Sequence, residues 1–595
     1  MSLLNKASLI MTPNAVKQSK VYSIIPSNGN GDFTFTRGTP ASSTLNNVSG
    51  LIETVPYNLL AFSEQFNDSV WIKNASTITP NVINSPNGTL TADKLNEDTT
   101  TTSHRVYQST SNSAIGTVTF SIYAKAGERN WLRLAVFDGG TSKYCFFNLT
   151  NGTIGTSTGL ISQSITSVGN GWYRCTITGD VIVTNIQSQV YIALSDNGFG
   201  YLGDGTSGLY LWGAQTVQGS VPKDYFFTTD RFNVPRLNYD TAGGCPSLLL
   251  EPQRTNLLLN SVWAGGGSLP TSWIAFSISG TSTSISSIKN PNVTAYRFIT
   301  TSAQRQDIGQ NFIFALNSIN CLSVYVESVD TAIPINQMIR ISAITGTGTS
   351  VFLKNNVVIS GATNIESGNT YTLQFTCTLS DTFSARVGSG VTTAISGNFV
   401  LSMPQLELGA YATSYIPTTT GTVTRIADTM SRNNIFTNGL ITSAGGTWFV
   451  ELNNNLPLIR DNAISSIIFA DNTSTNTFFL RADFVTSERI CILKRVGNSP
   501  LLLFTTTANT CKIAIKWNGS TADVFVNGVK VISATIFTST NLESIISQGL
   551  NITLNIKSML LFPTPLTDSE CIALTSFTNY ISYENMAINL NYVIQ

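Results

Sequence analysis

The chain has 595 residues, of which 33 are basic and 33 acidic, so its formal net charge is zero and only 11% of it is charged. This balance excludes the basic footprint of a nucleic-acid-binding protein, and an apolar content of 42% excludes a mainly disordered chain. The length exceeds a single hydrophobic core and predicts three or four domains.

The N-terminal residues 1–56 contain few large apolar clusters. A Gly/Asn turn at 27–32 precedes an alternating strand at 33–36, and a second turn covers 46–50. Such a segment buries little by itself, so we expect an extended arm that is ordered by other copies of the chain or by a docking surface. No apolar run reaches membrane-spanning length, and residues 1–20 lack a signal-peptide core. We therefore expect a protein made in a cytoplasm.

Two phrases occur twice and divide the chain. Residues 52–60 and 250–258 both read apolar-Glu-x-x-x-x-Asn-Leu-Leu. A closing phrase recurs with the same gaps, first as Gln215, Gly219 and Tyr225 and then as Gln405, Gly409 and Tyr415. A duplicated opening and closing indicate two copies of one domain. We assign them to residues 57–235 and 256–430, with a linker arm rich in Pro, Asn and Gly at 236–255.

Short strands separated by turns make up the first copy, which is the pattern of a β-sandwich. Strand side chains alternate between the two faces of a sheet. The inward set is expected to be Phe120, Ile122, Ala124, Leu132, Leu134, Val136, Tyr173, Cys175 and Ile177.

The outward positions of the same strands combine aromatic and basic side chains. If the strands are neighbours, one outer face carries aromatic planes beside cations, which suits sugars or a protein partner. The predicted glycan- or partner-binding residues are Tyr123, Lys125, Trp131, Arg133, Trp172 and Arg174. Packing against another domain or subunit is an equally good interpretation of this face.

The second copy keeps the core pattern but not this surface, since Gln374 and Thr376 stand where basic or aromatic residues would be expected. From residue 431 the pattern changes to a further run of strands. An Asn527-Gly528 pair predicts a type I′ hairpin, and Thr567 with Glu570 forms a capping box that opens a helix at 569–577. The strands are expected at 447–452, 465–470, 477–484, 489–495, 501–506, 511–517 and 522–531.

Residues with catalytic or metal-binding chemistry are sparse. The segment 155–159 matches G-x-S-x-G and 203–208 matches G-x-G-x-x-G, but no helix is expected after either, so we interpret them as a turn and a loop. His104 is the only histidine and is expected in an exposed loop. We therefore expect no catalytic residue, no metal and no cofactor.

The eight cysteines lack a C-x-x-C pair, which argues against zinc. A disulfide within each domain is one possibility. Buried free thiols are favoured, because these cysteines stand among apolar strand residues. The three pairs are Cys145 with Cys175, Cys321 with Cys377, and Cys491 with Cys511, while Cys245 and Cys571 stand alone.

The chain resembles tailed-phage virion appendages over nearly its whole length. Both sandwiches resemble the carbohydrate-binding-type jelly rolls of phage fibres, and the C-terminal 431–595 resembles laminin-G/concanavalin-A-like domains. The first sandwich carries this resemblance at 58–60, 63–66, Trp71, 120–125, 171–174, 203–208, 212–215 and Tyr225; the second at 405–409 and 414–418; the arm at 35–37 and 50–53; the C-terminal domain at 516–519, 526–528 and 566–570.

The resemblance implies an all-β virion protein, a fibre or decoration on head or tail, that docks through its arm and forms a homo-oligomer, most often a trimer. Its sandwiches would project and could bind host-surface glycans. A glycan-degrading enzyme is one rival, which a carboxylate pair facing a groove would support. A purely structural spacer without ligand is the other.

Overall fold

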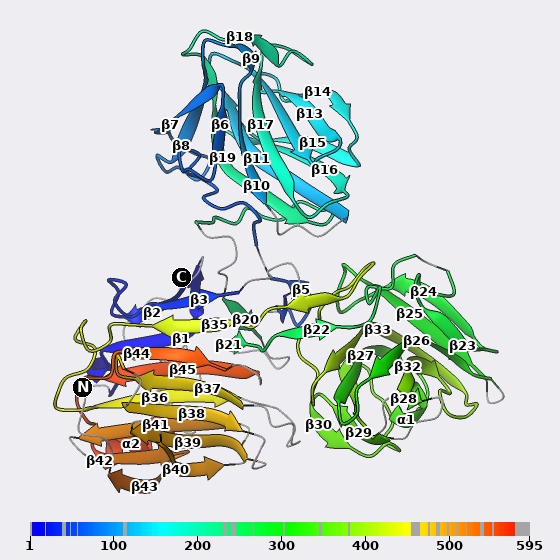
Figure 1. Cartoon of the computed structure of the whole chain (residues 1–595), viewed down its shortest axis with the longest axis vertical. Helices are drawn as coiled ribbons and strands as arrows, with labels where there is room; N and C mark the ends of the chain where they lie inside the picture. The colour runs from blue at the N-terminus through cyan, green and yellow to red at the C-terminus, as the bar shows by residue number, and fades with distance from the viewer. Residues whose placement is uncertain are drawn as a thin grey trace. The chain divides into compact units, whose positions relative to one another are not determined.

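Antiparallel strands form nearly all the regular structure of this chain, as the computed structural model shows (Figure 1). The chain divides into two compact units, one of Pro56–Val234 and one of Met1–Val55 with Pro235–Gln595. The predicted all-β class is confirmed, since the helices of the described residues are η1 (Leu3–Lys6), α1 (Ile335–Met338) and α2 (Asp568–Thr575). The structure describes residues 3–17, 20–37, 43–47, 49–55, 57–110, 116–229, 235–239, 246–265, 267–301, 304–343, 348–378, 381–453, 464–473, 476–483, 488–496, 499–506, 508, 510–518, 521–535, 541–549 and 553–576.

The unit Pro56–Val234 is a sandwich of two antiparallel sheets, called the first sandwich below. One sheet has the order β14-β13-β12-β17-β10-β6 and the other β15-β16-β11-β19-β8-β7, while β9 pairs with β18. The strands are β6 (Ile72–Asn74), β7 (Ser76–Ile83), β8 (Ala92–Glu97), β9 (Thr101–Ser103), β10 (Arg105–Thr110), β11 (Gly116–Ala126), β12 (Trp131–Phe137), β13 (Ser142–Asn148), β14 (Thr153–Thr158), β15 (Ser162–Gly169), β16 (Trp172–Val181), β17 (Ile186–Ala193), β18 (Gly200–Leu202) and β19 (Gly208–Gln218).

The core of the first sandwich follows the predicted alternation. Phe120, Ile122 and Leu134 are among its fully buried residues, and of the predicted inward set only Tyr173 is partly exposed. Residues 155–158 of the segment 155–159 lie within strand β14, so its interpretation as a turn was wrong, whereas 203–207 is a loop as expected. His104 is fully buried rather than exposed, because its ring nitrogens face the carbonyl oxygens of Ala75 and Tyr201.

A second sandwich lies within the other unit and repeats the plan of the first. Its sheets have the orders β23-β26-β32-β28 and β24-β25-β33-β27-β31-β29-β30, and β22 pairs with β34. The strands are β22 (Arg254–Asn256), β23 (Ile274–Ile278), β24 (Thr281–Ser286), β25 (Thr294–Thr300), β26 (Gln306–Phe314), β27 (Ile319–Val329), β28 (Ile339–Ala343), β29 (Gly348–Lys354), β30 (Val357–Ile359), β31 (Asn369–Cys377), β32 (Asp381–Ser389), β33 (Gly397–Leu408) and β34 (Val423–Arg425).

The repeated phrases form the same hydrogen-bonded closure in both sandwiches. The Asn58 side chain donates to the Phe226 carbonyl, as well as to that of Ala214, and accepts from the Leu60 amide. Asn256 does the same with the Ile416 carbonyl and the Leu258 amide. Each closing glutamine accepts a hydrogen bond from a backbone amide, Gln215 from Phe226 and Gln405 from Ile416. The hydroxyl of each closing tyrosine contacts a serine hydroxyl, in the pairs Tyr225–Ser63 and Tyr415–Ser261. The duplication seen in the sequence is therefore a duplicated way of joining the two ends of each sandwich.

The C-terminal sandwich is assembled from three distant parts of the chain. Its long sheet has the order β40-β39-β38-β37-β44-β35-β3-β2-β1-β45-β36-β41-β42-β43, with β20 and β21 attached at β45. The strands are β1 (Leu9–Lys17), β2 (Lys20–Ile25), β3 (Phe33–Thr36), β20 (Arg236–Asn238), β21 (Ser247–Leu250), β35 (Thr429–Arg432), β36 (Gly446–Asn453), β37 (Ile464–Ala470), β38 (Asn476–Asp483), β39 (Glu488–Val496), β40 (Ser499–Thr506), β41 (Thr510–Asn518), β42 (Thr521–Val526), β43 (Val529–Thr535), β44 (Ser544–Gln548) and β45 (Leu554–Phe562).

This assembly corrects the expectation of a free N-terminal arm at 1–56. Strand β1 pairs with β45, with Leu9 opposite Leu561, and β3 pairs with β35, with Phe35 opposite Met430 (Figure 1). Leu9 and Phe35 are fully buried in the core of the C-terminal sandwich. The apolar residues of β1–β3 are thus covered by the chain's own C-terminal part. The expected linker 236–255 also supplies strands, because Leu248 of β21 lies opposite Ile556 of β45.

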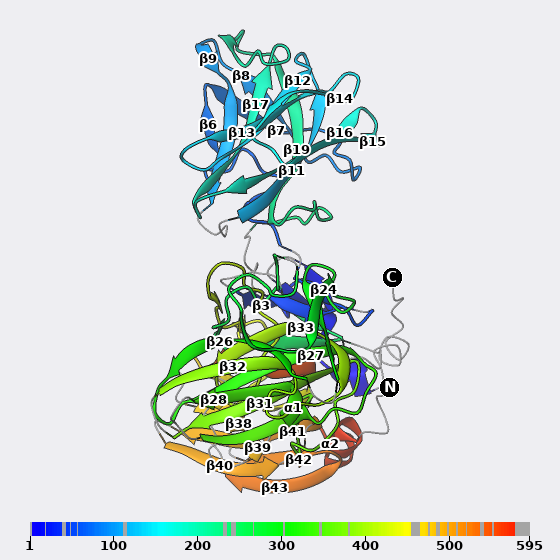
Figure 2. The ribbon, with the colours of Figure 1, turned by 90° about the vertical axis from the view of Figure 1, so that its right-hand side faces the viewer.

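Local signals in the C-terminal part are confirmed. Asn527 and Gly528 both have positive φ, 49° and 84°, as a type I′ hairpin between β42 and β43 requires. Helix α2 begins with the predicted capping box of Thr567 and Glu570. It lies beside β41 and β42 (Figure 2), and Glu570 also forms an ion pair with Lys6 from the N-terminal segment.

A buried charge cluster joins the linker to the end of the second sandwich. Arg236 forms ion pairs with Glu251 and Asp428, and Arg425 lies 3.0 Å from Glu251. Burial would raise the pKa of Glu251, but Arg425 and Arg236 lower it to about 2. Removing one partner from such a cluster leaves a buried charge uncompensated, which is strongly destabilising.

Six cysteines are buried free thiols, as the sequence favoured: Cys145, Cys175, Cys321, Cys377, Cys511 and Cys571. Burial raises the pKa of Cys145 and of Cys571 to about 12, so these thiols are poor nucleophiles. Cys245 lies outside the described residues, as does the side chain of Cys491.

Candidate ligand-binding face of the first sandwich

The six residues predicted to share one face are divided between the two sheets. Strands β11 and β16 are neighbours, so Tyr123 lies opposite Arg174 and Lys125 opposite Trp172. Strand β12, which carries Trp131 and Arg133, pairs instead with β13 and β17 in the other sheet. The two groups therefore point outward from opposite sides of the sandwich, and the expected single face is corrected to two.

The β11–β16 group is covered by its own chain. Trp172 is only 2% exposed and packs with Trp212 and Ala92, and its indole Nε1 donates to the Asn84 carbonyl at 3.2 Å. Arg174 donates to the Lys223 carbonyl at 2.5 Å. This group forms a small satellite core outside the sheet.

The remaining members of that group also have partners within the chain. The Tyr123 ring lies 5.2 Å from the ring of Trp212 and 5.9 Å from that of Tyr225. The Lys125 ammonium donates to the Asn170 carbonyl at 2.8 Å. A role for these residues in binding stays a prediction, but packing already explains their positions.

The β12 group belongs to a larger set of aromatic and basic residues. Arg133 is 4% exposed, and its guanidinium carbon lies 4.3 Å from the ring centroid of Tyr144 and 4.4 Å from those of Tyr191 and Phe199. Each cation–π contact stabilises by about 0.5–2 kcal/mol. Arg133 therefore holds three rings together; Tyr144 and Phe199 are half-buried, and Tyr191 is only 4% exposed. We call this set the aromatic–arginine face; its residues are Arg105, Tyr107, Trp131, Arg133, Tyr144, Tyr191 and Phe199.

Strand register places these side chains in adjoining rows. Arg133 lies opposite Tyr191, which lies opposite Arg105 on its other side. Arg105 donates to the Tyr191 hydroxyl at 2.7 Å, and that hydroxyl donates to Gln189 at 2.6 Å. The Arg105 guanidinium also lies over the Tyr107 ring, 5.2 Å from its centroid. A second arginine is thereby fixed on the same face, half-buried.

Neither arginine of this face has an ion pair with a carboxylate among the described residues. The Nε atoms of Arg105 and Arg133 are buried without a hydrogen-bond acceptor there. Burial lowers the pKa of Arg133, and the neighbouring Tyr191 opposes that shift. Two guanidinium groups without a balancing anion make a carboxylate or sulfate ligand electrostatically favourable at this face.

Trp131 lies half-buried at the edge of the face. A side chain on Gly155 of β14 would come within 2.8 Å of its indole, so the glycine allows the ring to reach across β13 to the strand beyond it. Asp196 accepts a hydrogen bond from the Thr156 amide at 2.7 Å and holds the adjacent loop. A half-buried aromatic ring is suited to stacking on a ligand.

Sequence reasoning missed several members of this face. Their signal was the same alternation used elsewhere, because Arg105 and Tyr107 stand two apart on β10. Alternation does not show the order of the strands in the sheet, so it could not show that these residues share one face. Phe199 lies in a loop, where no periodicity marks it.

Two further observations concern the described residues only. None of their histidine, cysteine, aspartate or glutamate side chains forms a group of three or more placed to hold a metal ion. No helix that the described ranges contain is both long and apolar enough to cross a membrane.

Comparison with known proteins gives structural likeness only. No protein-family model matches the sequence, and no curated protein matches it. Among solved structures, the chain is similar to the Ruminococcus gnavus IT-sialidase CBM40, with 18% identity over 23% of this chain and 84% of that chain and a TM-score of 0.18. It is similar to the carbohydrate binding module CBM66 from Bacillus subtilis, with 11% identity over 20% of this chain and 75% of that one and a TM-score of 0.17. It is also similar to the CBM22-1–CBM22-2 tandem domain of Paenibacillus barcinonensis Xyn10C, with 10% identity over 60% and 100% and a TM-score of 0.18. At these identities and TM-scores the likeness carries no functional argument.

Proposed function

We propose that the first sandwich binds glycans that carry an acidic group, on the aromatic–arginine face. The observation that carries the proposal is a pair of arginines held among aromatic rings without a carboxylate partner in the described part of the chain. Rings stack on the C–H faces of sugars, while a planar guanidinium binds a carboxylate or sulfate through paired hydrogen bonds. Half-buried Arg105 and Trp131 are the members best placed to touch such a ligand.

We further propose that the chain is a structural virion protein, a fibre or decoration on head or tail, and that it catalyses no reaction. It would assemble as a homo-oligomer, and a trimer is the expected form. The sequence resemblance to phage appendages supports this proposal, as does the tandem of sandwiches. Docking to the particle would have to use surfaces other than a free arm, because β1–β3 belong to the C-terminal sandwich. Light scattering of the purified protein measures the oligomer, and a monomer at assembly concentrations would contradict the trimer.

The test of glycan binding uses the full chain on an array of acidic and neutral glycans, followed by calorimetric titration of the best acidic ligand. Arg105→Gln and Trp131→Ala are expected to weaken binding at least tenfold. Lys125→Gln is the matched control, because it removes a cation from the opposite side of the same sandwich. Failure of every acidic glycan to bind, or equal loss in the control variant, would refute the proposal.

The same titration mixtures distinguish the enzymatic rival. Chromatography of the glycan after long incubation should recover it intact. If shortened products form, and if the substitution of a single carboxylate residue abolishes them, the function is glycan hydrolysis rather than binding.

A further inference from the structure

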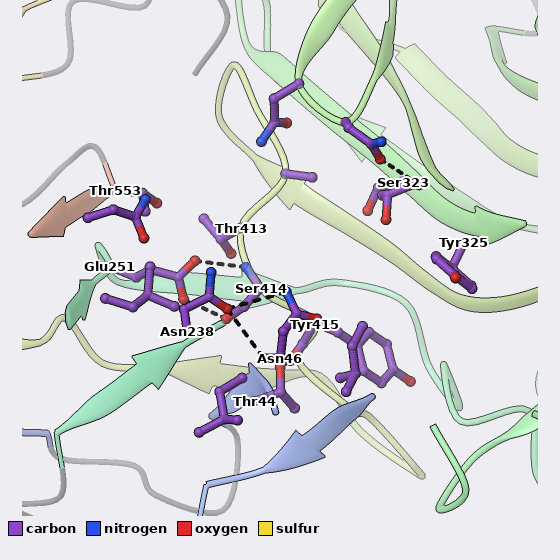
Figure 3. Close-up of a pocket in the computed structure, with 18 of the residues that line it drawn as sticks. Thr44, Asn46, Asn238, Glu251, Ser323, Tyr325, Thr413, Ser414, Tyr415 and Thr553 are labelled. Carbon is purple, nitrogen blue, oxygen red and sulfur yellow. Dashed lines mark hydrogen bonds between the residues drawn. The ribbon is translucent and has the colours of Figure 1, made fainter. Parts of the chain in front are cut away.

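A polar pocket of about 840 Å³ lies in the unit that contains the second and C-terminal sandwiches (Figure 3). Figure 3 shows Ser323 and Tyr325 on one side and Thr553 on the other, with Glu251 and Ser414 between them. The volume falls in the range of small-molecule sites, about 300–1,000 Å³. Side-chain amides are unusually frequent in its lining and include Asn46, Asn238, Asn355, Asn356, Asn369 and Asn555.

The pocket occupies a face that the first sandwich fills with tryptophan. In the first sandwich, Tyr123 lies opposite Arg174 on one side and Trp212 on the other. In the second, Tyr325 lies at the same register between Thr370 and Ser402. Large side chains have thus been exchanged for small ones on both flanks of the tyrosine.

Several landmarks confirm that these positions correspond. Ser121 lies opposite Gln215 just before a bulge in the first sandwich, and Ser323 lies opposite Gln405 just before a bulge in the second. The residue two before Gln215 is Gly213 and the residue two before Gln405 is Met403, and both have positive φ, 61° and 52°. Two residues before Arg174 stands Trp172, whereas two residues before Thr370 stands Gly368, which lines the pocket.

Segments from elsewhere in the chain turn this open face into a pocket. The hairpin of β4 (Thr44–Asn46) and β5 (Ile52–Thr54) is fixed to the second sandwich, because the Ile52 amide donates to the Lys289 carbonyl at 2.9 Å and Thr44 donates to the Tyr415 carbonyl at 2.6 Å. The C-terminal sandwich adds Asn555 and Thr553, and the Thr553 amide donates to the Tyr411 hydroxyl at 2.7 Å. The walls are therefore held by hydrogen bonds independent of any ligand.

The chemistry of the walls differs from that of the aromatic–arginine face. The one carboxylate in the lining, Glu251, is already paired with Arg236 and Arg425. Lys289 donates to the Gly50 carbonyl and lies 5.4 Å from the centroid of the half-buried Tyr325 ring. What remains is mostly amides and hydroxyls, which both donate and accept hydrogen bonds, beside the rings of Tyr325 and Tyr415 and the ammonium group of Lys557.

We propose that this pocket is a second binding site, for a short neutral oligosaccharide that stacks on Tyr325 and exchanges hydrogen bonds with the surrounding amides. A neutral polyol matches walls made mostly of groups that donate and accept, and the ammonium groups of Lys289 and Lys557 can donate to its hydroxyl oxygens. The site is separate from the aromatic–arginine face, so either can exist without the other.

The test is saturation-transfer NMR and calorimetric titration of the full chain with maltotriose, cellotriose and chitotriose. At least one of the three is expected to bind. Thr370→Trp, which places an indole in the pocket as the first sandwich does on its own face, should abolish that binding. Asn238→Ala and Tyr325→Ala should weaken this binding about tenfold or more. If Thr370→Trp lowers the melting temperature, these two variants test the pocket in its place.

Arg105→Gln is the control, because it disables the other site. Neutral-sugar binding that survives Arg105→Gln and is lost in Thr370→Trp supports the pocket even if no acidic glycan binds the first sandwich. Three outcomes would overturn the inference. Binding could be unchanged in all three pocket variants, it could be lost only in Arg105→Gln, or none of the trisaccharides could bind.

Discussion

Two tryptophans of the first sandwich that look alike in the sequence differ in what surrounds them. Trp172 is 2% exposed inside the satellite core, whereas Trp131 is half-buried at the edge of the aromatic–arginine face. We expect Trp172→Ala to lower the free energy of unfolding by about 3–5 kcal/mol, as large-to-small core substitutions do. Trp131→Ala should cost about 1 kcal/mol or less. Urea denaturation of the two variants measures both, and equal losses would contradict the division between core and face.

Asp93 gives the first sandwich a pH dependence. Burial raises its pKa from 3.8 to about 6, although the Asn81 and Phe66 amides donate to the carboxylate and oppose the shift. The folded state therefore favours the protonated carboxyl of Asp93. The contribution of Asp93 to stability is complete below pH 3.8 and is lost as the pH rises through about 6.

The free energy of unfolding of the first sandwich should therefore fall as the pH rises from about 4 to about 6. Asp93→Asn should flatten this slope, because the amide does not titrate. Glu97 does not contribute to this fall in stability. Despite burial, hydrogen bonds from Arg129 and Tyr201 lower its pKa, so its own effect on stability lies below its ordinary pKa of 4.5. An unchanged slope in the Asp93→Asn protein would show that another group is responsible.

At the scale of elements, strands β1–β3 close a sheet rather than extend from the molecule. Leu9, Met11, Val21, Phe33 and Phe35 are all fully buried in the C-terminal core. Deletion of residues 1–37 would expose the edge of β45 and the apolar side chains beneath, and unpaired edges of this kind promote aggregation.

We expect the shortened chain to lose the unfolding transition of the C-terminal sandwich or to become insoluble, while the transition of the first sandwich stays. Thermal melting followed by circular dichroism tests this, with Phe35→Ala as a milder variant expected to cost about 3–5 kcal/mol. A truncated protein that keeps both transitions would restore the view of residues 1–56 as a dispensable arm.

At the scale of the whole molecule, the described residues of the unit Pro56–Val234 supply the core and the closing contacts of their own fold. Its core residues and its closing hydrogen bonds, such as those of Asn58 and Gln215, all come from within that range. We expect a protein of residues 56–234 to fold alone and to melt at the temperature of the corresponding transition in the full chain. A chain of residues 235–595 is the contrasting case, because it lacks β1–β3 and should not give a stable C-terminal sandwich. An unfolded 56–234 fragment would contradict the division into units.

The all-β class, the duplication and the local turn and capping motifs could be predicted from the amino-acid sequence alone. Alternation identified Phe120, Ile122 and Leu134 as core because strand side chains point to opposite faces whatever the strand pairs with. The hairpin at Asn527-Gly528 and the capping box at Thr567 were equally visible, since both are formed by residues a few positions apart.

Which strands are neighbours became clear only from the fold, and this changed both the predicted site and the predicted arm. Alternation shows that Trp131 and Trp172 face away from the core, but not that they lie on opposite sheets, because strand order depends on contacts between distant residues. The pairing of Leu9 with Leu561 joins positions 552 residues apart, which no local pattern can indicate. The same holds for the pocket, whose walls come from three distant segments that meet only when the chain is folded.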